Sequence, residues 1–314
     1  MLKVLEHRRS LSQAVAPTSV PSQVEAPAVA RAPEQRVFEV GNLIAGRYRL
    51  ESRLGQGGVG IVFRASDLEL GETIAVKIFA QATGDPQAAV NFRQELKLTR
   101  QLTHPNVIRL FDIGVHDGHR FITMELLRGR DVKSMLGHPL DIAEGLSLLV
   151  QACAGLQAAH DQGVIHRDVK PENLFVLENG VLKVMDFGIA KQHDTSAVGT
   201  GLVAGTPEYI APEQIREFTS VGPSADLYAL GAVAYEMFTA TPPFRERDLH
   251  ALLRAHLEQA PEPPSDRNPD LPRELDEILL KLLEKAPGRR YSSCRQLAAA
   301  LEPIRQRHAV HGFF

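Results

Sequence analysis

The periodicity of the apolar residues changes near Gly129, and this change constrains the fold more than any other feature of the chain. Before it, short strand-like runs alternate with turn residues. The runs cover residues 48–54, 61–65, 73–79, 108–115 and 120–125. After it, apolar residues recur mostly at helical spacing. Strands followed by helices predict an α+β fold with a small sheet at the N-terminal end and a larger helical part after it.

Local signals refine this outline. Gly71-Glu72 makes a hairpin turn between two of the strand-like runs. Asp85-Pro86 reads as an N-cap followed by proline at the first helical position, so a helix should run from there to about Leu102. Residues 224–239 are apolar on nearly every side, as in a helix at the centre of a domain. Asp226 near its start must therefore find hydrogen-bond donors. Further helices are expected over 141–160, 246–258, 272–284 and 293–302, with the Pro-rich stretch 261–272 as a connection.

The first 45 residues differ in composition from the rest. Residues 10–36 are rich in Ala, Pro, Val, Ser and Gln. Prolines at this density remove backbone donors and favour extended conformers, so no helix or sheet should persist there. We therefore expect a disordered tail over 1–45, order from about Leu43 onward, and a short C-terminal tail over 305–314.

Charge and composition exclude several classes of protein. The formal net charge of −3 argues against a dedicated nucleic-acid binder. No apolar run approaches the length of a membrane span, and no apolar core follows the charged residues at the N-terminus. Cys153 and Cys294 do not form a metal-type pair, and Cys153 lies on the apolar face of an expected helix, as a core thiol would. The chain is expected to be soluble and cytoplasmic.

A glycine-rich stretch follows the first strand-like run. Gly55, Gly57 and Gly60 fit the pattern GxGxxG. Dinucleotide-binding folds use the same spacing, but there a helix follows the glycines. Here a strand-like run follows, so a strand–turn–strand flap whose amides approach phosphate groups is the better interpretation. A glycine-rich surface hairpin is the structural alternative.

Two more clusters carry polar groups at defined spacing. Lys77 ends an apolar strand, and Glu95 lies eighteen residues later inside the expected helix, where it could pair with the lysine. Asp168 and Asn173 lie in the stretch His-Arg-Asp-Val-Lys-Pro-Glu-Asn, and Asp186 of Asp-Phe-Gly follows thirteen residues after the asparagine. A base, an asparagine and a carboxylate at this spacing can hold a hydroxyl nucleophile beside metal-bound ATP phosphates.

Taken in order, these motifs resemble those of the eukaryotic-type (Hanks-type) serine/threonine protein kinases, and in particular the bacterial branch. The resemblance covers residues 46–304. It implies the two-lobed protein kinase fold, with an N-lobe over about 46–125, a hinge over 125–128, a C-lobe over about 129–304, and ATP in the cleft between the lobes. It further implies transfer of the γ-phosphoryl group of ATP to Ser/Thr hydroxyls of proteins, with Mg²⁺ as the cofactor and Mn²⁺ as an alternative ion.

The resemblance also assigns roles to individual positions. The implied catalytic set is Asp168, Lys170, Lys77, Glu95 and Thr206, and the implied metal ligands are Asn173 and Asp186. The implied ATP-binding set is Leu54, Gly55, Gly57, Gly60, Val62, Ala75, Lys77, Met124, Glu125, Leu127, Asp131 and Phe175, and Met124 also fits ordinary core packing. The implied structural supports are His166, Arg167, Glu213, Asp226 and Arg290, with Glu213 paired to Arg290 and Asp226 accepting from the backbone of the catalytic loop. Ala286 departs from the pattern, since many relatives carry aspartate there, and this weakens a local cap.

Regulation follows from Arg167, which precedes Asp168 as in kinases switched by activation-loop phosphorylation. A phosphate on the loop would pair with this arginine and order the segment. Thr200 is the preferred site, and Thr195 and Ser196 are the other candidates; an unmodified polar loop is the alternative. The phosphate would come from the chain itself or from an upstream kinase.

Two other functions compete with the protein kinase. A pseudokinase would bind partners without turnover, and it predicts a gap in the catalytic set, which this sequence does not show. A small-molecule kinase is the second rival, but such relatives generally lack the segment 205–213 and the Glu213–Arg290 pair. The protein substrates stay unidentified at this level, and neither a nucleic-acid partner nor a membrane span is expected.

Overall fold

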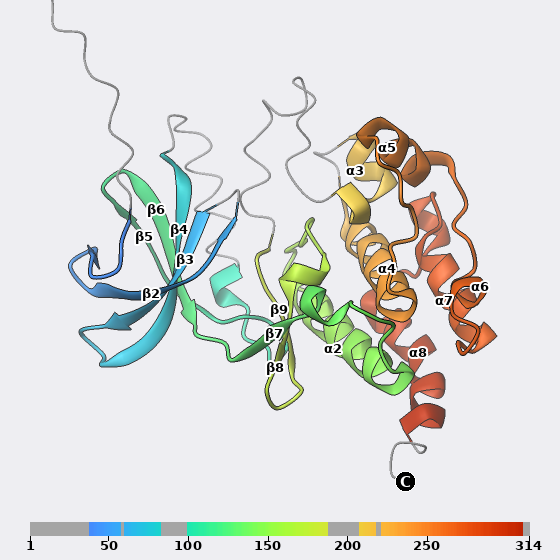
Figure 1. The fold of residues 1–314 in the computed structure, drawn as a ribbon, viewed down its shortest axis with the longest axis horizontal. Coiled ribbons are helices and arrows are strands. Elements are labelled where there is room, and N and C mark those ends of the chain that lie inside the picture. Colours follow the sequence, from blue (N-terminus) through green and yellow to red (C-terminus); the bar gives the residue numbers. More distant parts are fainter. Residues whose placement is uncertain (1–37, 58–59, 83–98, 188–206, 218–220, 310–314) are drawn as a thin grey trace, which may run out of the picture. The chain divides into compact units, whose positions relative to one another are not determined.

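The structure is a computed structural model that describes residues 38–57, 60–82, 99–187, 207–217 and 221–309 (Figure 1). The chain divides into two compact units, Met1–Phe38 and Glu39–Phe314. The elements below belong to the second unit.

Within the described residues, six strands form one antiparallel sheet, in the order β1-β2-β3-β4-β6-β5 (Figure 1). They are β1 (Leu43–Ile44), β2 (Tyr48–Gly57), β3 (Gly60–Asp67), β4 (Glu72–Ala82), β5 (Leu110–His116) and β6 (His119–Glu125). Each expected strand is confirmed, and most extend by one to three residues because pairing with a neighbour continues past the apolar run. Gly71 has φ +70° in the turn between β3 and β4, a conformation that favours glycine, so the predicted turn is also confirmed.

A second sheet was not predicted. It consists of β7 (Gly129–Asp131), β8 (Leu174–Leu177) and β9 (Leu182–Val184), paired antiparallel in that order. Strands this short leave almost no periodic signal in a sequence, so only tertiary pairing reveals them. The sheet joins the segment after β6 to the segment that follows the catalytic loop.

The remaining described elements are helices. The longer helices are α2 (Ile142–His160), α4 (Pro223–Thr239), α5 (Leu249–Glu258), α7 (Arg273–Leu282) and α8 (Cys294–Ala309). Shorter helices are α3 (Pro212–Arg216) and α6 (Pro264–Arg267), with 3₁₀ turns at η1 (Lys133–Met135), η2 (Pro171–Asn173), η4 (Pro207–Tyr209) and η6 (Pro287–Arg289). α6 lies inside the Pro-rich stretch that the sequence reads as a plain connection.

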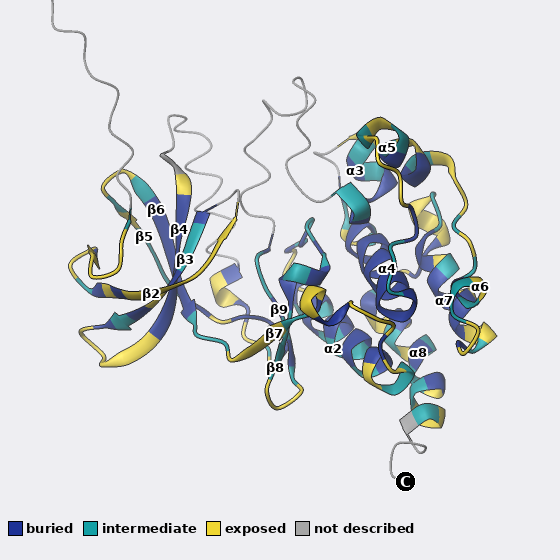
Figure 2. Cartoon of the chain, viewed as in Figure 1, coloured by how far each residue is buried: buried dark blue, intermediate teal, exposed yellow. Residues whose placement is uncertain are grey.

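Helix α4 is the centre of the helical part. Every residue from Ala225 to Thr239 is buried, as the dark blue of this helix shows (Figure 2). α2 and α7 pack against it, and α8 packs along α2. The prediction of a helix apolar on every side is therefore confirmed, and the carboxylate of Asp226 lies inside it with no exposed surface.

The predicted end of the last helix is wrong. α8 does not stop before Pro303 but runs through it to Ala309. Proline removes one helical hydrogen bond, yet Leu301 and Ile304 on either side are buried, and burial of two apolar side chains offsets that loss. Arg305 also donates two hydrogen bonds to Glu302 across the proline. Residues 305–309 thus belong to the helix and not to a tail.

The helix expected after Asp85 falls almost wholly outside the described residues. Only residues 99–101 of it are seen, and they are helical. Leu102, which follows, is buried, as expected for its apolar face.

By length and composition α2 could cross a membrane, and half of its most apolar window is buried inside the fold. Its buried residues pack in the core against α4, α8 and β9. Core packing accounts for its apolar character, so length and composition alone are weak evidence for a span.

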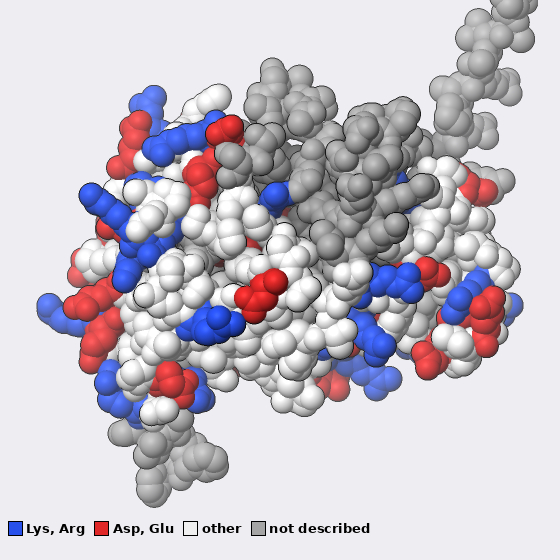
Figure 3. Space-filling view, turned by 180° about the vertical axis from the view of Figure 1, so that it is seen from behind, with Lys and Arg blue, Asp and Glu red and all other residues white. Residues whose placement is uncertain are grey.

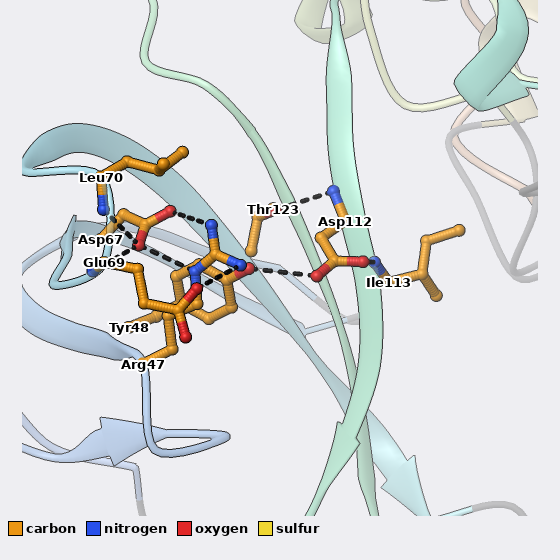
Figure 4. Close-up of polar contacts among 8 residues, drawn as sticks. All are labelled: Arg47, Tyr48, Asp67, Glu69, Leu70, Asp112, Ile113 and Thr123. Atoms are coloured by element: carbon orange, nitrogen blue, oxygen red, sulfur yellow. Dashed lines mark hydrogen bonds and ion pairs between the residues drawn. The ribbon is translucent and has the colours of Figure 1, made fainter.

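A polar network links strands β2, β3 and β5 of the large sheet (Figure 4). Arg47 donates two hydrogen bonds to Asp67, at 2.8 and 2.6 Å, and lies over the ring of Tyr48. The Tyr48 hydroxyl in turn donates to Asp112 on β5 at 3.2 Å. The Arg47 guanidinium lowers the pKa of the nearly buried Asp67 carboxyl. On the face seen in Figure 3, acidic and basic side chains lie near one another without a large region of one sign.

Candidate active site

The glycine-rich stretch forms the predicted strand–turn–strand flap. β2 and β3 pair antiparallel up to Gly57 opposite Gly60, and the two residues between them lie outside the described part. A Cβ on Gly60 would lie 2.2 Å from the carbonyl oxygen of Ile78, so only glycine fits there. Gly55 and Gly57 have open space around them, and Leu54 is half exposed. The dinucleotide-binding alternative is wrong, because a strand and not a helix follows the glycines.

Lys77 extends from the middle of the sheet toward the helical part. It pairs with Val62 on β3 and Ile122 on β6, and its side chain is about one-tenth exposed (11%). Its Nζ lies 2.7 Å from Oδ2 of Asp186. The sequence predicted Glu95 as the partner of this lysine, and Glu95 lies outside the described residues. The observed ion pair brings together two predicted site residues that are more than a hundred positions apart.

The catalytic loop holds its polar groups through bonds to one another. Lys170 Nζ lies 3.2 Å from Oδ2 of Asp168. Asn173 donates through Nδ2 to the carbonyl oxygen of Asp168 at 2.8 Å and to its carboxylate at 3.3 Å. The acidic side chain is therefore fixed by two neighbours of the same loop, and it stays partly exposed (16%).

Asp226 supports this loop from helix α4, as the sequence predicted. Its two carboxylate oxygens accept from the backbone N–H groups of His166 and Arg167, each at 2.8 Å. His160 lies 2.7 Å from the same carboxylate. Arg167 adopts φ +61°, a left-handed conformation that is costly for a side-chain-bearing residue. The carboxylate compensates that cost, because it satisfies two amides that the turn leaves without helical or strand partners.

His166 is a packing and hydrogen-bonding residue. It is fully buried, its Nε2 lies 2.8 Å from the carbonyl oxygen of Met185, and its ring lies 4.7 Å from that of Phe187. Met185 N–H also donates to the carbonyl oxygen of Asn173 at 2.8 Å. The residues immediately before and after Asp186 thus contact the catalytic loop. Asp186 itself has φ +52°.

The residues implied for the adenine pocket fall on β3, β4, β6, β7 and β8 and on the segment after β6. Ala75 on β4 pairs with Met124 on β6, and both are buried. Asp131 on β7 pairs with Phe175 on β8, and its Oδ1 accepts from Ser134 N–H at 2.8 Å. One of its carboxylate oxygens is therefore bonded to the backbone of the 3₁₀ turn η1. Leu127 is partly buried, as Val62 is, and both pack against the core.

One contact at the hinge was missed. Oε1 of Glu125 accepts from Lys183 Nζ on β9 at 2.7 Å and from the backbone N–H of Arg109 at 2.8 Å. The Glu125–Lys183 contact links the last residue of β6 in the large sheet to β9 in the small sheet. No spacing in the sequence indicates such a pair, because its members come from segments 58 residues apart whose pairing depends on an unpredicted strand.

The anchor expected after the activation segment is present. Both oxygens of Glu213 accept from Arg290, at 2.6 and 2.8 Å. Ala286 provides no side-chain cap for η6, in keeping with its departure from the pattern. Thr206 and the candidate phosphosites Thr200, Thr195 and Ser196 lie outside the described residues.

The two cysteines take no part in this site. Both are buried, and burial raises the pKa of Cys153 to about 12. A thiol with such a pKa stays protonated, so Cys153 is a core residue as predicted.

The donor set next to Asp168 suits a hard divalent cation. Asn173 uses its amide nitrogen on Asp168, which leaves its oxygen for another partner, and Asp186 supplies a partly exposed carboxylate. The described residues contain no group of three or more His, Cys, Asp or Glu side chains placed to hold a metal. Two protein oxygens completed by phosphate and water oxygens match the way Mg²⁺ is usually held.

Comparison with known proteins agrees with this geometry. A profile of the protein kinase domain matches residues 48–301. Serine/threonine-protein kinase Pkn1 of Myxococcus xanthus is 36% identical over 312 residues, which is 96% of this chain and 45% of that protein. PknA of Mycobacterium tuberculosis is 36% identical over 275 residues, 85% of this chain and 63% of that protein. The chain spans about 39% to 51% of the length of the first three curated relatives it matches.

Solved structures show the same fold. The crystal structure of the Mycobacterium tuberculosis PknI kinase domain superimposes with a TM-score of 0.70 at 28% identity, covering 85% of this chain and 99% of that chain. The sheet of β1–β6, the helical part around α4 and the order of the motifs agree with this match. The chain therefore belongs to the protein kinase family, whose members use ATP and a divalent metal.

Proposed function

We propose that this protein is a serine/threonine protein kinase that transfers the γ-phosphoryl group of ATP to hydroxyl groups of proteins, with Mg²⁺ as the cation and Mn²⁺ as an alternative. The observation that carries the proposal is the Lys77–Asp186 contact at 2.7 Å, beside a loop in which Asp168, Lys170 and Asn173 touch one another. These are the groups that position phosphates, metal and acceptor in this chemistry. The named relatives support the serine/threonine class.

Each side chain has a defined task in the proposed reaction. Asp168 orients the acceptor hydroxyl and accepts its proton. Lys170, within ion-pair distance of Asp168, offsets the charge that develops on the transferring group. Lys77 holds the phosphates of the nucleotide. Asn173 and Asp186 would hold the divalent cation, which would supply positive charge to offset that of the nucleotide phosphates. Catalysis then rests on positioning and electrostatics.

The test is phosphoryl transfer from labelled ATP to Ser-, Thr- and Tyr-containing peptides. We expect label on Ser and Thr only, and Asp168→Asn should lower kcat by about 10²- to 10⁴-fold, the range for a positioned general base. Asp270→Asn is the matched control, because Asp270 is exposed and makes no side-chain bond among the described contacts. Equal transfer by wild type and Asp168→Asn would reject the proposal.

The rival functions give different results in the same assay. A pseudokinase binds the nucleotide and transfers nothing to peptide, protein or water. A small-molecule kinase labels a metabolite alcohol in a cell extract and leaves every peptide unlabelled. The observed Glu213–Arg290 pair favours a protein-substrate platform over this last alternative.

Regulation by phosphorylation of the activation loop is part of the proposal. Arg167 lies next to Asp168, and a phosphate at Thr200, Thr195 or Ser196 is proposed to pair with it. Mass spectrometry of wild type and Asp168→Asn would separate sites made by the chain itself from sites made by an upstream kinase. The proposed cytoplasmic location is tested by fractionation of cells that produce the full-length protein.

A further inference from the structure

An internal ion pair lies beside the catalytic loop and plays no part in the proposed chemistry. Lys133, in η1, places Nζ 2.9 Å from Oε1 of Glu236 on helix α4 and 3.5 Å from the hydroxyl of Tyr209. The Tyr209 hydroxyl donates to the other oxygen of Glu236. The Glu236 side chain is 5% exposed, whereas that of Lys133 is 47% exposed. The ammonium therefore reaches inward from the surface to a buried carboxylate.

Two more carboxylates act on the same ammonium. Burial alone would lower the pKa of Lys133, but the bond to Glu236 and the charges of Glu236, Glu172 and Glu208 raise it above its ordinary value. Glu172 and Glu208 each keep one buried carboxylate oxygen that has no hydrogen-bond partner among the described residues. Glu236 thus binds the ammonium directly, and Glu172 and Glu208 add negative charge near it. A buried carboxylate is costly unless a donor or a cation compensates it.

The three glutamates lie close to the position at which the acceptor hydroxyl is proposed to bind. Glu172 lies in η2 between Lys170 and Asn173, the two residues that contact Asp168. Glu208 lies in η4, two residues after Thr206 of the implied catalytic set. A peptide whose hydroxyl lies at Asp168 must therefore pass close to the acidic cluster, here defined as Glu172, Glu208 and Glu236.

We propose that Lys133 is a specificity-determining residue: its ammonium fills the acidic cluster, so that acceptor peptides need no basic side chain there. The inference rests on the proposed function and names the class of substrate, a peptide without a required Arg or Lys beside the acceptor. Lysine carries a compact charge with three donors, which suits a position shared by a carboxylate, a hydroxyl and two further negative groups. Without Lys133, the same groups would bind a cationic side chain of the substrate.

The experiment uses peptides with one acceptor serine and arginine at each flanking position in turn, compared with a neutral peptide. Each peptide is also made with alanine in place of the serine, so that binding is measured without turnover. For the wild type we expect the arginine and neutral peptides to bind within about threefold of each other. In Lys133→Met, arginine at one position should improve binding and kcat/KM about tenfold, the gain from a charge-assisted hydrogen bond.

Two further variants separate specificity from folding. Lys133→Arg keeps the cation and should keep the wild-type preference. Lys133→Met/Glu236→Gln removes both charges and should lose the new arginine preference while its Tm stays close to that of the wild type. If Lys133→Met shows no arginine preference at any position, or the wild type already shows the full tenfold preference, the inference is wrong. If the wild type turns over none of the peptides, the proposed function is rejected. The binding ratios measured with the alanine peptides would still test the role of Lys133.

Discussion

Arg290 is a buried charged residue that donates five hydrogen bonds, so its removal should destabilise the protein strongly. Its side chain has no exposed surface. It donates to both oxygens of Glu213, to the carbonyl oxygen of Glu284 at 2.7 Å, to that of Ser224 at 2.9 Å and to that of Lys285 at 3.2 Å. Arg290→Met keeps much of the apolar volume and removes the guanidinium donors from all of these acceptors, while Ser224 Oγ still donates to Glu213 at 3.2 Å.

The magnitude follows from the geometry. Breaking a buried ion pair by removing one partner costs about 3–5 kcal/mol. The Glu213 side chain is 19% exposed, so water can partly solvate it in the variant, and the cost should lie near the lower end of that range. A loss of about 3 kcal/mol corresponds to a fall in Tm of roughly 6–12 °C.

The assay is thermal and urea unfolding of wild type, Arg290→Met, Glu213→Gln and the double variant. Because the two side chains share one interaction, the double variant should lose clearly less than the two single losses added together. Arg289→Met is the matched control: Arg289 is 75% exposed and 3.9 Å from Glu284, so it should change stability by less than about 0.5 kcal/mol. A loss below about 1 kcal/mol for Arg290→Met, or strict additivity with Glu213→Gln, would refute the reasoning.

Three other changes test separate parts of the fold. Gly60→Ala should destabilise the protein by about 1–3 kcal/mol in urea unfolding, because its Cβ would overlap the Ile78 carbonyl, whereas Gly57→Ala has open space and should fold normally. Burial and the nearby Lys285 charge lower the pKa of His256 to about 3. Between about pH 6.5 and pH 3 the unfolded state therefore binds a proton that the folded state does not, so the free energy of unfolding decreases as pH falls through this range. His256→Gln should reduce this pH dependence of the free energy of unfolding, and an unchanged pH dependence would contradict the assignment. Burial lowers the pKa of Lys285 to about 8, and it has no carboxylate within ion-pair distance among the residues seen in the structure. Lys285→Met should therefore raise the urea midpoint at pH 7, with no gain above about pH 10.5, where the unfolded lysine is also neutral; a destabilised variant at pH 7 would count against it.

The sequence predicts the strands, the long helices and the catalytic loop well, because each carries a local signal. The buried carboxylate of Asp226 is an example: a charge in an apolar helix requires donors, and the structure supplies two amides of the catalytic loop. Glu213 and Arg290 were placed together by resemblance and lie together.

What the sequence misses depends on tertiary contacts. The Glu125–Lys183 and Lys133–Glu236 pairs join segments whose proximity no spacing encodes. The β7–β9 sheet has strands too short for a periodic pattern. Helix α8 passes Pro303 because packing of its neighbours outweighs a local breaker, which propensity alone cannot show.

The Asp226 carboxylate also bears on how slowly two backbone amides of the catalytic loop exchange with solvent. The amides of His166 and Arg167 exchange with solvent only when their bonds to a carboxylate with no exposed surface break, and that carboxylate belongs to helix α4, which is buried from Ala225 to Thr239. The most protected amides of a protein exchange only with free energies close to that of global unfolding. We therefore expect these two amides of the catalytic loop, though its backbone is irregular, to exchange as slowly as the amides of helix α4. Its geometry should persist under any fluctuation that leaves helix α4 in place.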